Sequence, residues 1–146
     1  MIIEVKISLV EGIYAEENCV RVIEMDENAT LSELHDAIQD AVSFDREHLY
    51  DFYFANSPHA RKRVSLTELD DWVEWDEREK VFMRTRLKNV RPEGRRRLYY
   101  LFDFGDSWLF DVKIASKRKP NEEGVRYPRV IKTEGPNPQQ YPIWEE

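Results

Sequence analysis

Residues 98–114 read Leu-Tyr-Tyr-Leu-Phe-Asp-Phe-Gly-Asp-Ser-Trp-Leu-Phe-Asp-Val-Lys-Ile. This stretch predicts two strands, over 98–104 and 108–114, because aromatic and β-branched side chains favour sheet. The Gly105-Asp106 pair between them is typical of a tight hairpin turn, in which Gly105 can adopt positive φ. Bulky side chains on both faces of the first strand indicate an interior position in the sheet. The stretch therefore predicts an antiparallel hairpin at the centre of the fold.

The segments before this hairpin predict a second pair of strands, a helix and a further strand. Residues 3–9 alternate apolar and polar side chains, which is the pattern of a strand with one buried face. Thr30 and Glu33 form a capping box, and apolar residues recur at helical spacing after it. The predicted elements are antiparallel strands over 3–9 and 19–25, a helix over 30–42 and a strand over 49–54.

Weaker patterns fill much of the remaining chain. Ser65 and Glu68 repeat the capping signal at the start of a short apolar stripe. Pro128 restricts the last predicted strand to an edge of the sheet, because proline cannot donate to the ladder. The weaker patterns predict a short helix over 65–75, a helical turn over 84–90 and a strand over 127–131.

Together the elements predict an α+β fold, namely a mixed, mostly antiparallel sheet with one main helix packed on it. The strand–strand–helix–strand opening is the order used by ubiquitin-like sheets, an analogy of fold that says nothing of function. The 146 residues suit one domain. We expect it to span 1–146, with a core over about 3–133 and an extended, Pro-rich tail over 134–146.

The composition excludes several classes of protein. An aromatic content of 12% argues against disorder, and apolar runs of only a few residues argue against a membrane-spanning helix. The N-terminus lacks the pattern of a secretory signal. The single Cys19 rules out an intrachain disulfide and a multi-cysteine metal site, and its place in a strand predicts a buried side chain. We expect a soluble, cytoplasmic protein without a membrane partner.

The net charge of −7 is unevenly distributed along the chain. Residues 1–80 carry a net charge of −12, whereas residues 81–146 carry +5. Seven acidic residues lie between Glu68 and Glu79, either on a solvated helix face or on a docking surface for a basic partner. The two halves of the chain either interleave and neutralise each other or present two faces to different partners.

Two aspartates and two histidines are the candidate residues for acid–base or metal-binding chemistry. Asp103 and Asp106 either accept hydrogen bonds from the amides of their own turn or bind a hard cation through oxygen. His35, on the predicted helix, and His48, before the third strand, would complete a metal-dependent or hydrolase-like site only if all four groups met in one pocket. Their spacing matches no local metal motif, and we predict no metal and no cofactor.

Trp108 and a basic loop complete the candidate residues. Trp108 follows the hairpin turn, where it either lines the same pocket or packs in the core of its strand. The arginines of the basic loop, beside Tyr99 and Tyr100, could contact phosphates while the two rings stack on bases. The other interpretation is a solvated loop. The arginines are Arg91, Arg95, Arg96 and Arg97.

Three functions follow from these residues. The leading hypothesis is a non-catalytic interaction module that binds a protein or peptide, because no nucleophile elbow or phosphate-binding glycine loop is present and two segments carry opposite charge. The first alternative is the metal-dependent or hydrolase-like enzyme described above. The second is a nucleic-acid-binding accessory protein that uses the basic loop.

Three segments, in matching order and at matching intervals, carry a resemblance to one family. They are Thr30-Leu-Ser-Glu-Leu-His-Asp-Ala-Ile-Gln39, His48-Leu-Tyr-Asp-Phe52 and Tyr100-Leu-Phe-Asp-Phe-Gly-Asp-Ser-Trp108. The chain resembles the plasmid pRi ORF-three-like family over roughly 3–140, and this family consists of small proteins known mainly from plasmids, transposon-like elements and bacterial or archaeal genomes. The resemblance implies a shared fold and a mobile-element context, but no reaction.

The sequence departs from the family pattern at two places that bear on chemistry. Leu109-Phe110-Asp111-Val112 stands where the family usually has Glu-His-x-Ile, so the family histidine is absent. The segment from Glu134 to Gln140 lacks the cysteine and later acidic residues of the usual ending. The resemblance therefore supports the fold more than any activity.

Overall fold

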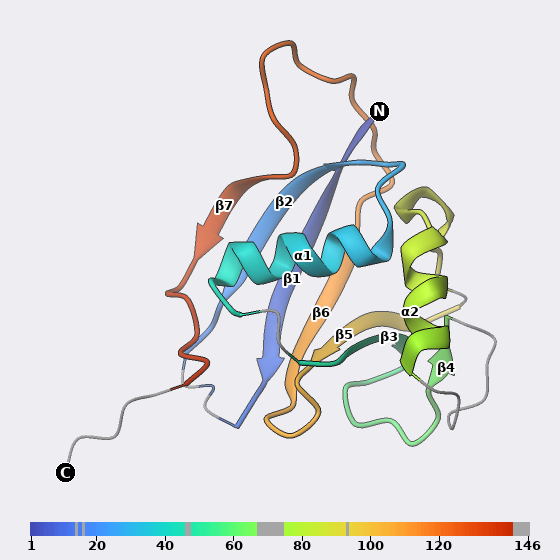
Figure 1. Cartoon of the computed structure of the whole chain (residues 1–146), viewed down its shortest axis with the longest axis vertical. Coiled ribbons are helices and arrows are strands. Elements are labelled where there is room, and N and C mark those ends of the chain that lie inside the picture. Colours follow the sequence, from blue (N-terminus) through green and yellow to red (C-terminus); the bar gives the residue numbers. More distant parts are fainter. Residues whose placement is uncertain (14, 16, 46–47, 67–74, 93, 142–146) are drawn as a thin grey trace.

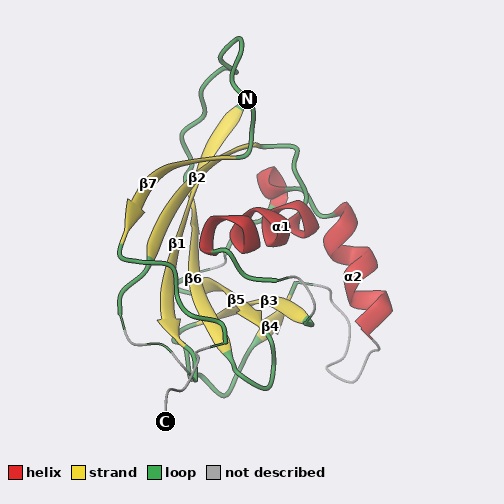
Figure 2. Cartoon of the chain, turned by 60° about the vertical axis from the view of Figure 1, so that its left-hand side comes forward, coloured by secondary structure: helices red, strands yellow, loops and turns green. Residues whose placement is uncertain are grey.

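The structure, a computed structural model, describes residues 1–141 except 14, 16, 46–47, 67–74 and 93, and it is an antiparallel sheet with helices on one side (Figures 1 and 2). The seven strands lie in the order β4-β3-β5-β6-β1-β2-β7. The elements are β1 (Ile2–Glu11), β2 (Val20–Asp26), α1 (Leu31–Val42), β3 (Tyr50–Ala55), β4 (Val64–Ser65), α2 (Trp75–Arg84), the 3-10 turn η1 (Leu87–Asn89), β5 (Arg97–Phe102), β6 (Trp108–Ile114) and β7 (Arg129–Glu134).

The predicted central hairpin is present as β5 and β6. The two strands are antiparallel, with Tyr100 opposite Phe110 and Phe102 opposite Trp108. β3 flanks the hairpin on one side and β1 on the other, so both strands are interior, which for β5 the bulky residues on both faces indicated. The predicted pairing of β1 with β2 is also confirmed, as is the edge position of β7.

The core lies between the sheet and α1. Strand residues alternate between the two faces, so one face of β1, β3, β5 and β6 supplies large apolar side chains to a single buried cluster beneath the helix. Leu34 and Ile38 of α1 are fully buried in that cluster. A smaller cluster on the opposite face contains Tyr53, Ala55, Tyr99 and Leu109. Cys19 is buried, as predicted, and burial raises the pKa of its thiol.

Local signals position α1 as the capping box predicted. Thr30 Oγ1 accepts a hydrogen bond from the Glu33 backbone N–H, and the Glu33 carboxylate accepts one from the Thr30 backbone N–H. Each contact satisfies an amide that the first turn of a helix leaves unpaired. The helix ends at Ser43, which adopts the left-handed conformation with φ 59°.

Several details of the predicted fold differ from the structure. Every strand pair among the described residues is antiparallel, so the sheet is not mixed. A second helix, α2, accompanies the predicted main helix, and η1 lies within the predicted turn at 84–90. The helix predicted over 65–75 lies largely outside the described residues, as does most of the acidic run. β3 is separated from β1 by β5 and β6, so the likeness to ubiquitin-like sheets is limited to the order of elements.

The segment after β7 contains no helix or strand over its described residues 135–141, and buried Arg21 holds it. Arg21 donates hydrogen bonds to the Glu134 carbonyl at 3.0 Å and to Asn137 Oδ1 at 2.7 Å. Gly135 has φ +78°, and a Cβ there would lie 1.8 Å from the Asn18 carbonyl oxygen. Glycine is therefore required where the tail passes the loop between β1 and β2.

Candidate functional site

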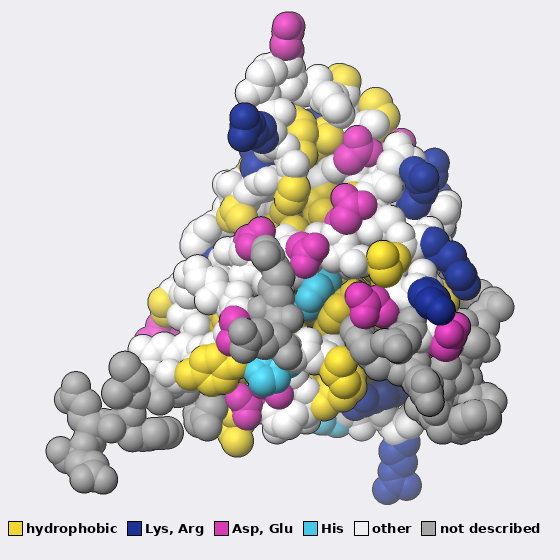
Figure 3. Space-filling model, in the orientation of Figure 1, with side chains coloured by type: hydrophobic (Ala, Val, Ile, Leu, Met, Phe, Trp, Pro, Cys, Tyr) yellow, Lys and Arg dark blue, Asp and Glu magenta, His cyan; other side chains and the backbone are white. Residues whose placement is uncertain are grey.

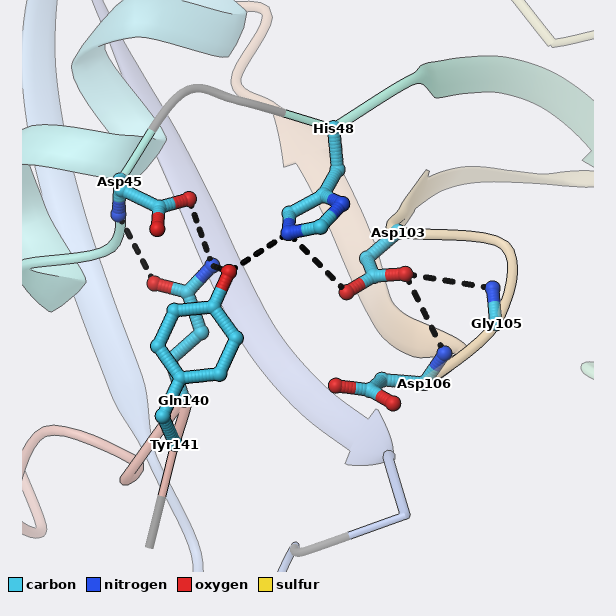
Figure 4. A network of polar contacts seen from close by, with 7 residues as sticks. All are labelled: Asp45, His48, Asp103, Gly105, Asp106, Gln140 and Tyr141. Carbon is cyan, nitrogen blue, oxygen red and sulfur yellow. Dashed lines mark hydrogen bonds and ion pairs between the residues drawn. The ribbon is translucent and has the colours of Figure 1, made fainter.

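The turn between β5 and β6 is held by the Asp103 carboxylate. Asp103 Oδ1 accepts hydrogen bonds from the backbone N–H groups of Gly105 at 3.2 Å and Asp106 at 3.3 Å (Figure 4). The positive φ angles fall on Asp103 (58°) and Ser107 (54°), so the prediction that Gly105 supplies this conformation was wrong. An aspartate tolerates the left-handed region because its side chain bonds the backbone ahead of it.

His48 lies beside this turn and contacts two groups through one ring nitrogen. His48 Nε2 is 2.5 Å from the Tyr141 hydroxyl and 3.6 Å from Asp103 Oδ2 (Figure 4). The contact with Tyr141 is a hydrogen bond, whereas the contact with Asp103 is an ion pair only when the imidazole is protonated. His48 therefore joins three segments that are distant in sequence: the start of β3, the hairpin turn and the tail.

The tail reaches His48 because Gln140 anchors it to the loop after α1. Gln140 Oε1 accepts from the Asp45 backbone N–H at 2.8 Å, and Gln140 Nε2 donates to Asp45 Oδ1 at 2.9 Å (Figure 4). Gln140 is buried by these contacts. Asp45, Gln140 and Tyr141 could not be predicted at this site, since no local pattern connects residues more than ninety positions apart.

Asp106 is the third candidate in the same place. Its half-buried side chain lies close to the Asp103 carboxylate (Figure 4). Burial, together with the negative charge of Asp103, raises the pKa of Asp106. The structure thus brings His48, Asp103 and Asp106 together at one end of the β5–β6 hairpin.

The described contacts of His35 lie in the core beneath α1. Its ring stacks on Tyr50 at 3.7 Å between centroids, and Nδ1 bonds the Tyr100 hydroxyl at 2.5 Å. Gln39 Nε2 donates to the same hydroxyl at 2.9 Å, which places His35 in a buried polar network under α1. Burial raises the pKa of Tyr100 well above its ordinary value, so its hydroxyl stays protonated and can donate. His35 is a hydrogen-bonded core residue.

No group of three or more His, Cys, Asp or Glu side chains among the described residues is placed to hold a metal ion. The four-residue site of the metal-dependent hypothesis is therefore not assembled within that part of the chain. Trp108 is fully buried and its ring packs 5.0 Å from Phe44, so it supports the turn from the core rather than lining a pocket.

Two of the four arginines of the basic loop lie beside a cavity, and the other two do not. Arg96 and Arg97 border a cavity beside β6, whereas Arg91 and Arg95 do not line it. Tyr99 is fully buried, as is Tyr100 beneath α1. Neither ring can stack on a base, so this part of the nucleic-acid hypothesis was wrong.

These observations define a class: an α+β protein with an antiparallel sheet and an aspartate-clamped hairpin turn at one end. The chain belongs to the plasmid pRiA4b ORF-3-like protein family, which it matches over residues 1–140. The resemblance carried by the three sequence segments is thereby confirmed. No helix in the described part of the chain is long and apolar enough to cross a membrane.

Of two further comparisons, one supports the fold and neither indicates a function. The crystal structure of a protein of unknown function from Methanosarcina mazei Go1 is similar to this chain, with a TM-score of 0.63 and 24% identity over 93% of this chain and 70% of that one. At this identity the likeness concerns the fold alone. No curated protein matches the sequence.

Proposed function

We propose that this protein is a non-catalytic interaction module that binds an extended peptide segment of a partner protein along the open edge of β7. The observation that carries the proposal is the exposure of this edge. β7 is the last strand of the sheet, and no strand among the described residues pairs with its outer side. Val130 and Ile131 are each 44% exposed, although edge strands usually avoid exposed apolar side chains.

A shallow hollow beside β7 supports the same site. It has a volume of about 120 Å³, lies between α1 and β7, and includes Ala37, Ala41 and Val130 in its lining. The two alanines leave room that larger helix residues would fill. A peptide strand added to β7 would direct every second side chain toward this hollow, while its backbone would bond the strand edge.

The charge of α1 indicates which peptide would fit. The helix carries Glu33, Asp36 and Asp40 and no Lys or Arg, and acidic side chains gather over α1 in Figure 3. Asp40 also lines the hollow. The two basic side chains of β7 already form ion pairs, because Arg129 pairs with Glu24 and Lys132 with Glu134. The partner segment therefore combines a small apolar side chain with a lysine or arginine two residues away.

The clamped hairpin turn supports a binding role more than a catalytic one. The Asp103 carboxylate accepts hydrogen bonds from the amides of its own turn, and His48 Nε2 is hydrogen-bonded to Tyr141. Nucleic-acid binding through the basic loop has no specific observation in its favour, because the two tyrosines beside it are in the core.

The test is selection from a library of random decapeptides displayed on phage, followed by affinity measurement on synthetic peptides. We expect selected peptides with the apolar–x–basic pattern, and N-methylation of alternate amides should abolish binding in one register only, because an added strand bonds through every second amide. Val130→Glu should weaken the best peptide roughly tenfold by burying a charge at the contact.

The matched control is Met83→Glu, which introduces the same charge at a residue that is 58% exposed on α2. It should leave peptide affinity unchanged, and circular dichroism should show that both variants are folded. The proposal is wrong if the library yields no binder, if both variants weaken binding equally, or if N-methylation has no effect in either register.

A further inference from the structure

A second site lies where β6 extends past the start of β5. A cavity of about 530 Å³ opens there, beside β1 and β6. β5 begins at Arg97, and its last registered pair on this side is Leu98 with Val112, whereas β6 continues to Ile114. Ile114 therefore lacks a neighbour from β5. Val90 and Pro92, which precede β5, contribute a wall of the resulting gap.

The lining combines an apolar wall with an excess of positive charge. Its apolar members are Val22, Val90, Pro92, Leu98, Val112, Ile114 and Ala115. Its charged members are the cations Lys6, Arg96, Arg97 and Lys113 and the acids Glu4 and Asp111. Four cations against two acids give the cavity a positive field, and this field favours an anionic ligand.

One ion pair within the lining leaves the other cations available. Arg97 Nη1 lies 3.5 Å from Asp111 Oδ2, so these two charges largely satisfy each other. Within the described part of the chain, Lys6, Arg96 and Lys113 have no ion-pair partner. Arg96 is half-buried at the cavity, where its guanidinium has less access to water than a fully exposed one. A bound anion would supply the counter-charge.

We propose that this cavity binds a small organic anion that has an acidic head group on an apolar body. Arg96 and Lys113 would contact the head group, because guanidinium and ammonium groups form charge-assisted hydrogen bonds to oxyanions. The apolar wall would cover the body of the ligand. Ligand pockets typically have volumes of about 300–1,000 Å³, so the cavity can hold a drug-sized molecule. It shares no lining residue with the hollow beside β7, so the two proposals stand independently.

The experiment compares a charged probe with a neutral one. Anilinonaphthalene sulfonate carries an anionic group on an aromatic body, and phenylnaphthylamine is its neutral counterpart. Fluorescence titration of the full chain gives both affinities, and amide chemical-shift changes locate both probes. We expect the sulfonate to bind more tightly, with the largest shifts at Leu98, Val112 and Ile114.

Two double variants separate this cavity from the basic loop in general. Arg96→Gln with Lys113→Gln should weaken the sulfonate roughly tenfold or more, since each contact is a charge-assisted hydrogen bond, and should leave the neutral probe unchanged. Arg91→Gln with Arg95→Gln removes the same charge outside the cavity and should change neither affinity. Ala115→Trp should fill the cavity and reduce the binding of both probes, in a protein that keeps its circular dichroism spectrum.

Three outcomes would overturn the proposal. The first is an absence of sulfonate binding, and the second is binding whose shifts map elsewhere. The third is equal weakening by the two double variants, as a diffuse basic surface requires. An oligothymidylate that binds the wild type and is weakened equally by both double variants would assign the loop to nucleic acid instead.

Discussion

Gly12 and Trp108 are in such close contact that the residue at position 12 decides whether the Trp108 ring fits. A Cβ at Gly12 would lie 2.4 Å from Trp108 Cε3, and the indole is fully buried. Gly12→Ala should lower the free energy of unfolding by about 1–3 kcal/mol, the usual cost of overpacking a core. Urea unfolding measures this change.

Gly105→Ala is the matched control for that substitution. Its Cβ would lie 3.5 Å from Asp103 Oδ1, which is ordinary contact, and Gly105 does not have positive φ. It should change the free energy of unfolding by less than about 0.5 kcal/mol. If the two alanine variants lose equal stability, the contact of Gly12 with Trp108 is not the cause.

The raised pKa of Asp51 predicts a contribution to stability that falls as the pH rises, which is the opposite of the usual trend for a carboxylate. Burial raises its pKa to about 6, although the Arg78 guanidinium 3.1 Å away acts in the opposite sense. The folded state therefore holds the proton more tightly than the unfolded state, whose aspartate titrates near pH 4. The stabilisation from protonated Asp51 is fully present below about pH 4 and is lost as the pH rises through about 6.

Asp51→Asn should remove this component of the pH profile. From pH 4 to pH 7 the wild type should lose about 2–3 kcal/mol more stability than the variant, by the free energy equivalent of the pKa difference. Urea unfolding at several pH values gives both profiles, and the comparison cancels other groups that titrate in both proteins. Parallel profiles would show that Asp51 has an ordinary pKa.

The residues of the hairpin turn show what local sequence can predict about a site. Bonding to the amides of its own turn was one of two alternatives for Asp103, and it could be foreseen because such bonds depend only on neighbouring residues. The contact of His48 with Tyr141 could not be predicted. It depends on a tail whose path is fixed by Arg21 and Gln140, at positions far apart in the sequence.

Among the elements, α1 was the one most fully specified by its own residues. Its apolar spacing and capping box both depend on residues within one or two turns, so its bounds were predicted closely. Thr30→Ala should lower the free energy of unfolding by about 1 kcal/mol through loss of the N-cap. Thr30→Ser keeps a hydroxyl at the cap and should be close to wild type in urea unfolding, so equal losses would contradict a capping role.

The strands were predicted better than their arrangement. Alternation and aromatic content placed six strands within three residues of their observed ends, and the β5–β6 hairpin followed from the Gly105-Asp106 pair. The pairing of β1 with β6 and of β3 with β5 joins segments that are distant in the chain. The periodicity within one strand does not show which strand lies beside it or in which direction that strand runs. The prediction of a mixed sheet was wrong for this reason.

In the whole molecule, the two oppositely charged halves of the sequence interleave. Buried Glu24 pairs with both Lys119 and Arg129, and Glu27 pairs with Arg118 at 2.8 Å. These contacts join the acidic first half to the basic second half. The hydrogen bond from Lys119, followed by Arg129, lowers the pKa of Glu24 despite its burial. Internal neutralisation, one of the two interpretations of the charge split, therefore holds for these residues.

The position of β1 has a consequence for how the chain folds as it leaves the ribosome. β1 is made before β6, and Leu9 pairs with Phe110 on one side, so this edge of β1 has no partner until β6 has been synthesised. The β1–β2 hairpin and α1 can form in the meantime, with the apolar face prepared for β6 open to water. A nascent chain stalled before β6 should therefore associate with holding chaperones, and release should follow only after β6 has emerged.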